Sequence, residues 1–109
     1  MLEIYIREPA YSNLLNGYKK YELRLLKGIF KDLEIGQTVL ICNKATKKKI
    51  KRIVNRLLIY KNFKELLINL NINNCLINYT DINNGLDHLS NIYTHDIQNK
   101  YDCLALEFI

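Results

Sequence analysis

Proline, glycine and tryptophan are scarce in this sequence: its 109 residues include one proline, four glycines and no tryptophan. That composition excludes collagen-like and low-complexity chains. No apolar run approaches the ~18 residues of a membrane-spanning helix, so we expect no membrane partner. The first twelve residues carry charges of both signs and lack the apolar stretch of a signal peptide. We therefore expect a single cytoplasmic domain over residues 1–109, because a chain of this length holds one core.

Cysteine is also sparse. Cys42, Cys75 and Cys103 are far apart in the sequence, and no C-x-x-C pair is present. Zinc sites commonly use cysteines at that short spacing, so the sequence predicts no metal site and no other cofactor. Each cysteine lies among apolar residues, which is typical of a reduced thiol in a protein core.

Charge is distributed unevenly along the chain, whose formal net charge is +5. The residues before Glu65 carry +10, from 15 basic and 5 acidic side chains, and those from Glu65 onward carry −5, from 1 basic and 6 acidic side chains. The densest basic cluster contains no acid and consists of Lys44, Lys47, Lys48, Lys49, Lys51, Arg52 and Arg56. It is either the solvated tip of a hairpin or a surface that follows RNA phosphates. In the second case the contacts are Lys48, Lys49, Lys51 and Arg52.

The hydrophobic pattern predicts an α+β fold. Alternation of apolar and polar residues indicates strands, and apolar residues three or four apart indicate helices. In chain order we expect a strand at 2–7, a helix at 9–16, strands at 20–25, 38–42 and 50–60, helices beginning near 62 and 81, and a strand at 101–109. The Asn-rich stretch 69–78 fits no single assignment. This order predicts a small β-barrel of about five to six strands with two to three flanking helices.

Candidate reactive residues are concentrated at residues 17–25. On a strand, Lys20, Glu22 and Arg24 share one face, with Lys19 on the other face unless it precedes the strand. This face is either an exposed row of alternating charges or a polar wall inside a barrel mouth. In a barrel mouth, burial favours a neutral lysine that acts as a base, and an arginine can bind a carbonyl edge or a phosphate. We expect His88 on the polar side of the last helix and His95 in a loop, both at the surface.

The segment 17–41 carries the pattern G-x-K-x-x-E-x-R-L at Gly17, Lys19, Glu22, Arg24 and Leu25. Further matches follow at 60–67, 92–94 and 101–109. On these motifs and their order, the sequence resembles the ASCH family, whose fold is similar to that of PUA domains. The sequence departs from the family pattern at two positions that look structural, Gln37 and Asp102.

The resemblance implies a PUA-like barrel with a cleft that faces RNA or a nucleobase. One bacterial branch of the family hydrolyses the amide of N4-acetylcytidine, and Lys19 matches its catalytic lysine. Glu22 stands where that branch has a threonine, and Asp81 is the nearest candidate for its third catalytic residue, a glutamate.

Three functions are compatible with these residues. The first is binding of RNA or a modified nucleoside in a basic cleft, through Lys20, Arg24 and the basic cluster, with tyrosines as stacking surfaces. The candidate tyrosines are Tyr11, Tyr18, Tyr21 and Tyr93. The second is a small amidohydrolase for N4-acylated cytidines that uses Lys19, Glu22 and Asp81. The third is a metal-free ribonuclease, and a protein-interaction module also stays open. We expect a monomer.

Overall fold

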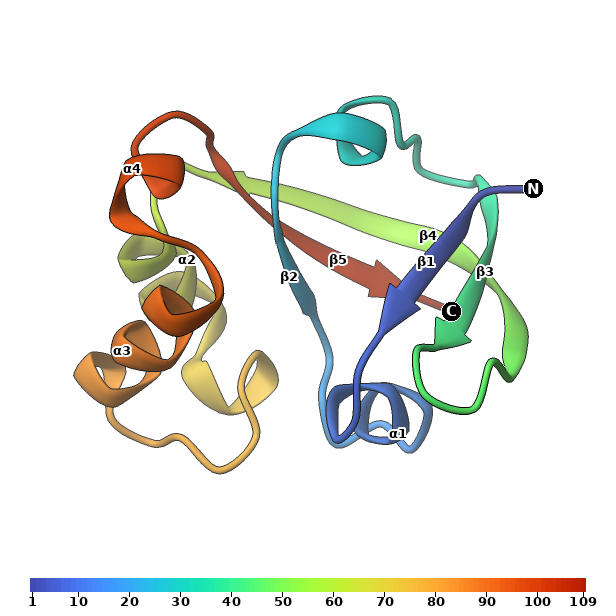
Figure 1. Cartoon of the computed structure of the whole chain (residues 1–109), viewed down its shortest axis with the longest axis horizontal. Coiled ribbons are helices and arrows are strands. Elements are labelled where there is room, and N and C mark those ends of the chain that lie inside the picture. Colours follow the sequence, from blue (N-terminus) through green and yellow to red (C-terminus); the bar gives the residue numbers. More distant parts are fainter.

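A curled sheet of five strands forms one side of the molecule, and a group of helices forms the other (Figure 1). The computed structural model describes residues 1–109. The strands are β1 (Glu3–Ile6), β2 (Glu22–Leu25), β3 (Thr38–Asn43), β4 (Lys49–Tyr60) and β5 (Cys103–Phe108). The helices are α1 (Ala10–Leu15), α2 (Phe63–Leu70), α3 (Ile82–Ile92) and α4 (His95–Gln98), with 3-10 turns η1 (Gly28–Lys31) and η2 (Ile72–Asn74). The predicted α+β fold is confirmed, with one correction: His95 begins the short helix α4 instead of lying in a loop.

The sheet is a half-barrel whose two edges are bridged by a side chain. The strand order is β1-β3-β4-β5-β2, so β1 and β2 are the edges. β1 runs parallel to β3, and the other pairs are antiparallel. Arg24 on β2 donates from Nη2 to the Tyr5 carbonyl on β1 over 2.8 Å. The barrel is therefore closed at this point by a guanidinium and not by a backbone ladder.

The long strand β4 belongs to both halves of the sheet. Its first part pairs with β3 and its second part with β5. A register shift between Val54 and Arg56 leaves Asn55 as a bulge, which bends the strand and interrupts the alternation of its side chains. This bulge brings Asn55 to the mouth of the half-barrel, beside Glu107.

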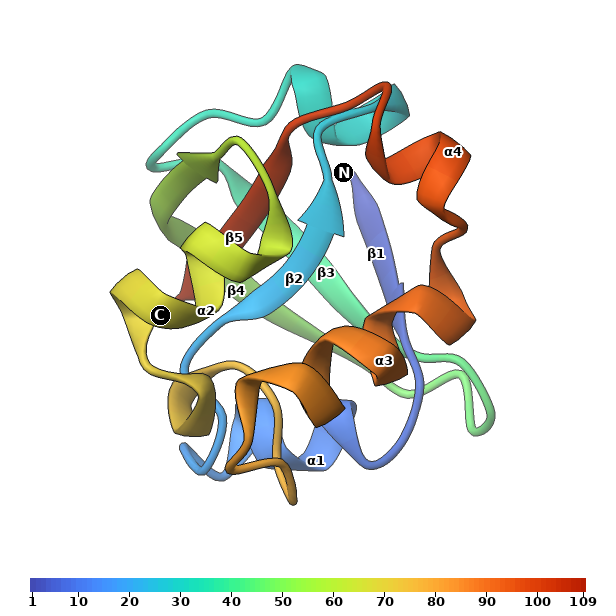
Figure 2. The ribbon, with the colours of Figure 1, turned by 90° about the vertical axis from the view of Figure 1, so that its left-hand side faces the viewer.

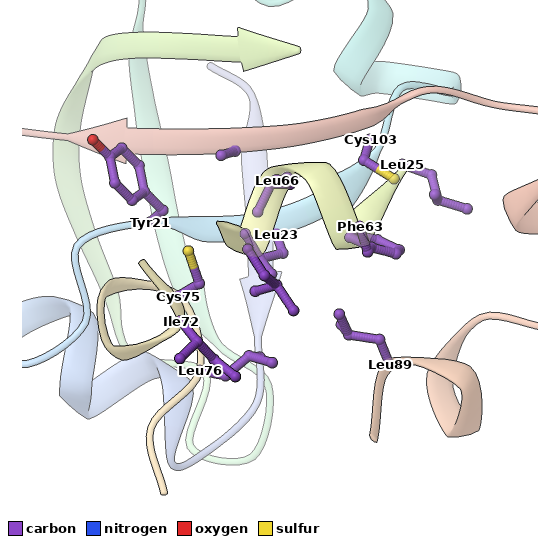
Figure 3. Close-up of a cluster of buried hydrophobic side chains, with 12 residues drawn as sticks. Tyr21, Leu23, Leu25, Phe63, Leu66, Ile72, Cys75, Leu76, Leu89 and Cys103 are labelled. Atoms are coloured by element: carbon purple, nitrogen blue, oxygen red, sulfur yellow. The ribbon is translucent and has the colours of Figure 1, made fainter. Parts of the chain in front are cut away.

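Two apolar cores lie on opposite sides of β2 and β5, where the sequence analysis expected one, because the sheet is covered on both faces. The helix-side core contains twelve buried residues, among them Leu23, Leu66 and Leu89, and Figure 3 shows side chains from β2, α2 and α3 converging on it. The barrel core contains nine buried residues, among them Val54 and Leu106. Figure 2, viewed from the helical side, shows β2 crossing between the helices and the remaining strands. Both faces of β2 are thus covered.

The Asn-rich stretch is an ordered part of the helix-side core. Ile72 and Cys75 are buried there, and the Asn74 carbonyl accepts hydrogen bonds from the backbone amides of Lys20 and Tyr21 at 2.9 and 3.0 Å. A Cβ at Gly85 of α3 would come within 2.8 Å of the Ile72 side chain, so this glycine lets α3 pack closely on η2. The stretch therefore fixes the start of β2. No helix in the chain has the length and apolar character needed to span a membrane.

Candidate functional site

Three charged side chains form a connected row on the barrel side of β2. The Glu22 carboxylate accepts from Lys19 Nζ at 2.9 Å through Oε1, and from Arg24 Nη2 and Nε at 2.8 and 3.1 Å through Oε2. Glu22 and Arg24 pair in register with Leu106 and Leu104 of β5, both of which belong to the barrel core. We call Lys19, Glu22 and Arg24 the charged row.

The charged row is buried, which is unusual for three ionisable groups. Lys19 and Glu22 are 7% and 5% exposed, and the Arg24 side chain is 22% exposed. Burial by itself would raise the pKa of Glu22, but the charges and hydrogen bonds of Lys19 and Arg24 outweigh it and lower that pKa. An ionised Glu22 thus occupies the position beside Lys19 Nζ. The lysine would have to leave this ion pair before it acted as the neutral base that the sequence suggested.

Lys19 joins the row because it precedes β2. Helix α1 ends at Asn16, and Gly17 follows with a φ of +80°, a left-handed turn that glycine adopts without strain. The Lys19 amide then donates to the Asn13 carbonyl of α1 at 3.0 Å. This turn directs Lys19 toward Glu22, whereas the Lys20 ammonium lies 3.7 Å from Glu107 and is about half exposed. Lys20 was predicted to share the face of Glu22 and Arg24, and Lys19 takes that place instead.

One end of the row opens into a cleft of about 360 Å³, which we call the lysine cleft. Its apolar wall includes Leu14, Ile41 and Phe108. Its polar groups come from four segments of the chain and are Lys19, Lys20, Arg52, Asn55, Asn74 and Glu107. Asn55 Nδ2 donates to Glu107 Oε1, and Asn74 Nδ2 donates to the Leu70 carbonyl at 3.0 Å. The cleft therefore combines fixed hydrogen-bonding groups with three cations and one carboxylate.

The other end of the row opens into a second cleft of about 470 Å³, which we call the arginine cleft. Its lining includes Arg24, Phe30, Tyr93 and Tyr101. Tyr93 stacks on Phe63 with ring centroids 5.8 Å apart. Burial raises the pKa of Tyr93, the Arg24 charge lowers it and the Glu22 charge raises it, so the ring lies close to the charged row. Of the predicted ligand residues, Arg24 and Tyr93 share this cleft.

Two predicted site residues have structural roles. Tyr11 is 7% exposed in the barrel core, so its ring does not offer a stacking surface to a ligand. Asp81 is the N-cap of α3, and its carboxylate accepts from the Asn84 amide at 3.1 Å. Asp81 lines neither cleft, and its one side-chain hydrogen bond is to the Asn84 amide, so no hydrogen bond joins it to the Lys19–Glu22 pair that it was predicted to assist.

The basic cluster is divided by the alternation of β4. Arg52 is opposite Val39 of the barrel core and lines the lysine cleft. Lys51 projects from the other face of the strand and is exposed. Lys48 precedes the strand and is also exposed, and Lys49 pairs with Glu3 at 2.7 Å. Only Arg52 of these four residues belongs to a cleft.

The sequence analysis missed residues that line both clefts. Asn55, Asn74 and Glu107 in the lysine cleft come from a bulge, a 3-10 turn and the last strand. Lys27 and Lys31 line the arginine cleft with Phe30 and Tyr101. The sequence signal for these lysines is a segment 27–31 that combines two lysines, a glycine and an aromatic ring directly after β2. No three His, Cys, Asp or Glu side chains are grouped so that they could hold a metal ion.

Comparison with known proteins identifies the fold without a function. No protein-family model and no curated protein sequence matches this chain. The crystal structure of hypothetical protein PH0355 is 26% identical to it, with a TM-score of 0.85 over 98% of this chain and 95% of that one. The solution NMR structure of protein PF0455 from Pyrococcus furiosus is 23% identical, with a TM-score of 0.78 over 98% of this chain and 94% of that one. The half-barrel with its flanking helices is thus found over nearly the whole length of two solved proteins.

Proposed function

We propose that this chain is an ASCH-like domain that binds a base or a modified nucleoside, carried by RNA or free, in the lysine cleft. The observation that carries the proposal is the buried charged row opening into a cleft of about 360 Å³. That volume lies in the range of small-molecule sites, about 300–1,000 Å³, which are mostly apolar with a few fixed polar groups. The lysine cleft has the fixed polar groups of such a site, and polar residues outnumber apolar ones in its lining.

The energetics of the charged row support a functional role. Buried ion pairs are weak contributors to stability, because desolvation offsets much of their attraction. Replacement of such pairs by apolar side chains of similar size is often neutral for stability. The charged row holds Lys19 in a fixed position at the cleft wall. Because the row adds little to stability, a role in ligand recognition explains its presence better than a role in folding.

The polar groups of the lysine cleft match the edges of a nucleobase. Asn55 and Asn74 each use one Nδ2 proton on a protein acceptor, which leaves the side-chain carbonyl to accept and the second Nδ2 proton to donate. Lys19, Lys20 and Arg52 supply donors and positive charge, and the apolar wall packs against a ring. Lys20 and Arg52 at the rim are suited to a phosphate of the same strand.

Binding is tested by titrating the protein with cytidine, N4-acetylcytidine and a short single-stranded RNA. We expect binding that a double variant, Lys20→Gln with Arg52→Gln, weakens, and an RNA salt slope that is smaller by about 1.4 in that variant. The matched control is Lys61→Gln with Lys64→Gln, which removes two charges from exposed positions outside both clefts. Equal RNA binding by the two double variants would contradict the proposal.

A second candidate function, hydrolysis of an N4-acylated cytidine, is favoured by Lys19, which lines the cleft and is held from behind by Glu22 at 2.9 Å. In this reaction water adds to the acyl carbonyl, and the Lys19 ammonium, held by Glu22, stabilises the developing oxyanion. The C–N bond then breaks, the proton released by the water passes to the leaving amine, and the products are cytidine and the carboxylic acid. A chromatographic assay with N4-acetylcytidine separates the two functions. A binding domain gives no cytidine, whereas an amidohydrolase gives cytidine that disappears in Lys19→Ala.

A further inference from the structure

The arginine cleft has no role in the proposed function, although it is as large as the lysine cleft. It lies at the other end of the charged row, next to η1. Its lining contains three cationic residues, Arg24, Lys27 and Lys31, and no acidic residue. A pocket with this charge favours an anion.

Arg24 has donors available for such an anion. It uses Nε and Nη2 for Glu22 and for the Tyr5 carbonyl. No buried side-chain nitrogen in the protein lacks a partner, so the remaining nitrogen, Nη1, reaches the surface with its two protons free. The guanidinium is held in place by β1 and β2, which makes it a preorganised donor. Lys27 and Lys31 add mobile positive charge beside it.

Aromatic rings stand next to these cations. The Arg24 guanidinium lies 5.3 Å from the centre of the Phe30 ring, and Lys27 Nζ lies 5.7 Å from the centre of the Tyr101 ring. Tyr93 completes the aromatic part of the lining. An inorganic phosphate does not stack on these rings, whereas a nucleobase does and is stabilised by the stacking. The lining therefore fits a ligand that joins a planar ring to an anionic group.

We propose that the arginine cleft is a second binding site, which takes a nucleotide with its phosphate on Arg24, Lys27 and Lys31 and its base against the tyrosine rings. The site does not depend on what the lysine cleft binds. The phosphate belongs either to a free mononucleotide or to an RNA strand, and both sources present the same chemistry to the cleft.

The test is a titration of the 15N-labelled protein with AMP, adenosine and inorganic phosphate at constant ionic strength. We expect AMP to bind about tenfold more tightly than either of the other two, since it alone uses both the cations and the rings. Amide shifts should be concentrated at 24–31, 93 and 101. Shifts confined to the lysine cleft, or equal affinity for AMP and adenosine, would overturn the proposal.

Variants separate this site from the lysine cleft. Lys27→Gln with Lys31→Gln should lower the AMP affinity toward that of adenosine, with Arg24 keeping part of the difference, and Tyr101→Leu should weaken AMP and adenosine together. Lys20→Gln with Arg52→Gln, which removes two charges from the lysine cleft, should leave AMP binding here unchanged. Unchanged AMP binding in the Lys27 and Lys31 double variant would refute the site even if the lysine cleft proves functional.

A final experiment, which compares AMP with hexa-adenylate, identifies the source of the phosphate. Hexa-adenylate that binds about tenfold more tightly than AMP, with the advantage lost at high salt, identifies an RNA strand. Equal affinity for AMP and hexa-adenylate identifies a free mononucleotide. Failure of both to shift the resonances of the arginine cleft would eliminate the site.

Discussion

The two faces of β2 are both buried, but they are buried in opposite ways. Toward the helices, Tyr21, Leu23 and Leu25 enter an apolar core in which the Tyr21 hydroxyl accepts from Arg56 at 2.8 Å. Toward the barrel, Glu22 and Arg24 form the charged row with Lys19. One strand thus carries a face that stabilises the fold and a face whose charges need partners in order to be buried at all.

The helix-side face stabilises the fold, and the barrel-side face is the one that the proposed function assigns to ligand binding. The helix-side core follows the usual rule that buried side chains are apolar and closely packed. The charged row follows a different rule, since two cations share the Glu22 carboxylate and the ends of the row open into clefts. Four predictions test this contrast, beginning with the largest expected effect.

Removing the central charge of the row should destabilise the protein most. Glu22→Gln keeps the shape of the side chain but leaves Lys19 and Arg24 without a counter-charge, so we expect a loss of about 3–5 kcal/mol in the free energy of unfolding. Urea unfolding followed by circular dichroism measures it. The comparison is a triple variant, Lys19→Met, Glu22→Leu and Arg24→Met, which buries no charge.

The triple variant should be more stable than Glu22→Gln and close to the wild type, because apolar replacement of a buried ion network is commonly neutral. It should also lose nucleoside binding. A triple variant that fails to fold would show that the charged row is needed for the structure. It would contradict the view that only the helix-side face of β2 stabilises the fold.

A matched pair of core truncations extends the comparison to the two apolar cores. Leu66 and Leu106 are both fully buried, one in each core, and truncation of either to alanine should cost about 2–5 kcal/mol. Only Leu106→Ala should also weaken nucleoside binding at temperatures where both proteins are folded, because Leu106 is the β5 residue paired with Glu22. Equal binding by both variants would mean that the barrel core does not position the row.

Much of this fold could be predicted from the sequence, because the strands and helices have clear periodicity. The alternation in 20–25 indicated β2 correctly. The alternation could not show that the charged face of β2 is buried, because the strands that cover this face, β1 and β5, are distant in the sequence. The predicted helix start near residue 62 was correct, and Asn62 is the N-cap of α2, with its side-chain Oδ1 accepting from the Glu65 amide. The four-residue helix α4 is too short to have a periodic signal.

The candidate site was only partly predictable. Lys19 and Glu22 stand three residues apart, and the sequence could not decide whether they meet, because this depends on the left-handed turn at Gly17. Asp81 was assigned to the site by resemblance, although its position before an amphipathic helix equally indicates an N-cap. The lining of both clefts combines distant segments, and no local pattern reports such a combination.

Acidification should lower the free energy of unfolding by a smaller amount, through protonation of Glu22. Its pKa in the folded protein is lowered from the ordinary value of 4.5, so the unfolded chain takes up the proton first as the pH falls. The stabilisation by Glu22 is therefore complete above pH 4.5 and is lost as the pH falls through the lower folded value. The difference in unfolding free energy between the wild type and Glu22→Gln should shrink on acidification. A difference that is constant with pH would contradict an ionised Glu22.

The smallest effect should come from Asp81, and it decides between a cap and a catalytic residue. Asp81→Ala removes the acceptor for the Asn84 amide at the start of α3, so we expect a loss of about 1 kcal/mol in stability. Asp81→Ser keeps a capping oxygen and should recover most of that loss. Nucleoside binding and any turnover should be unchanged in both variants, because Asp81 lines neither cleft. Loss of turnover in Asp81→Ala without loss of stability would return this residue to the active site and would require α3 to move toward Lys19.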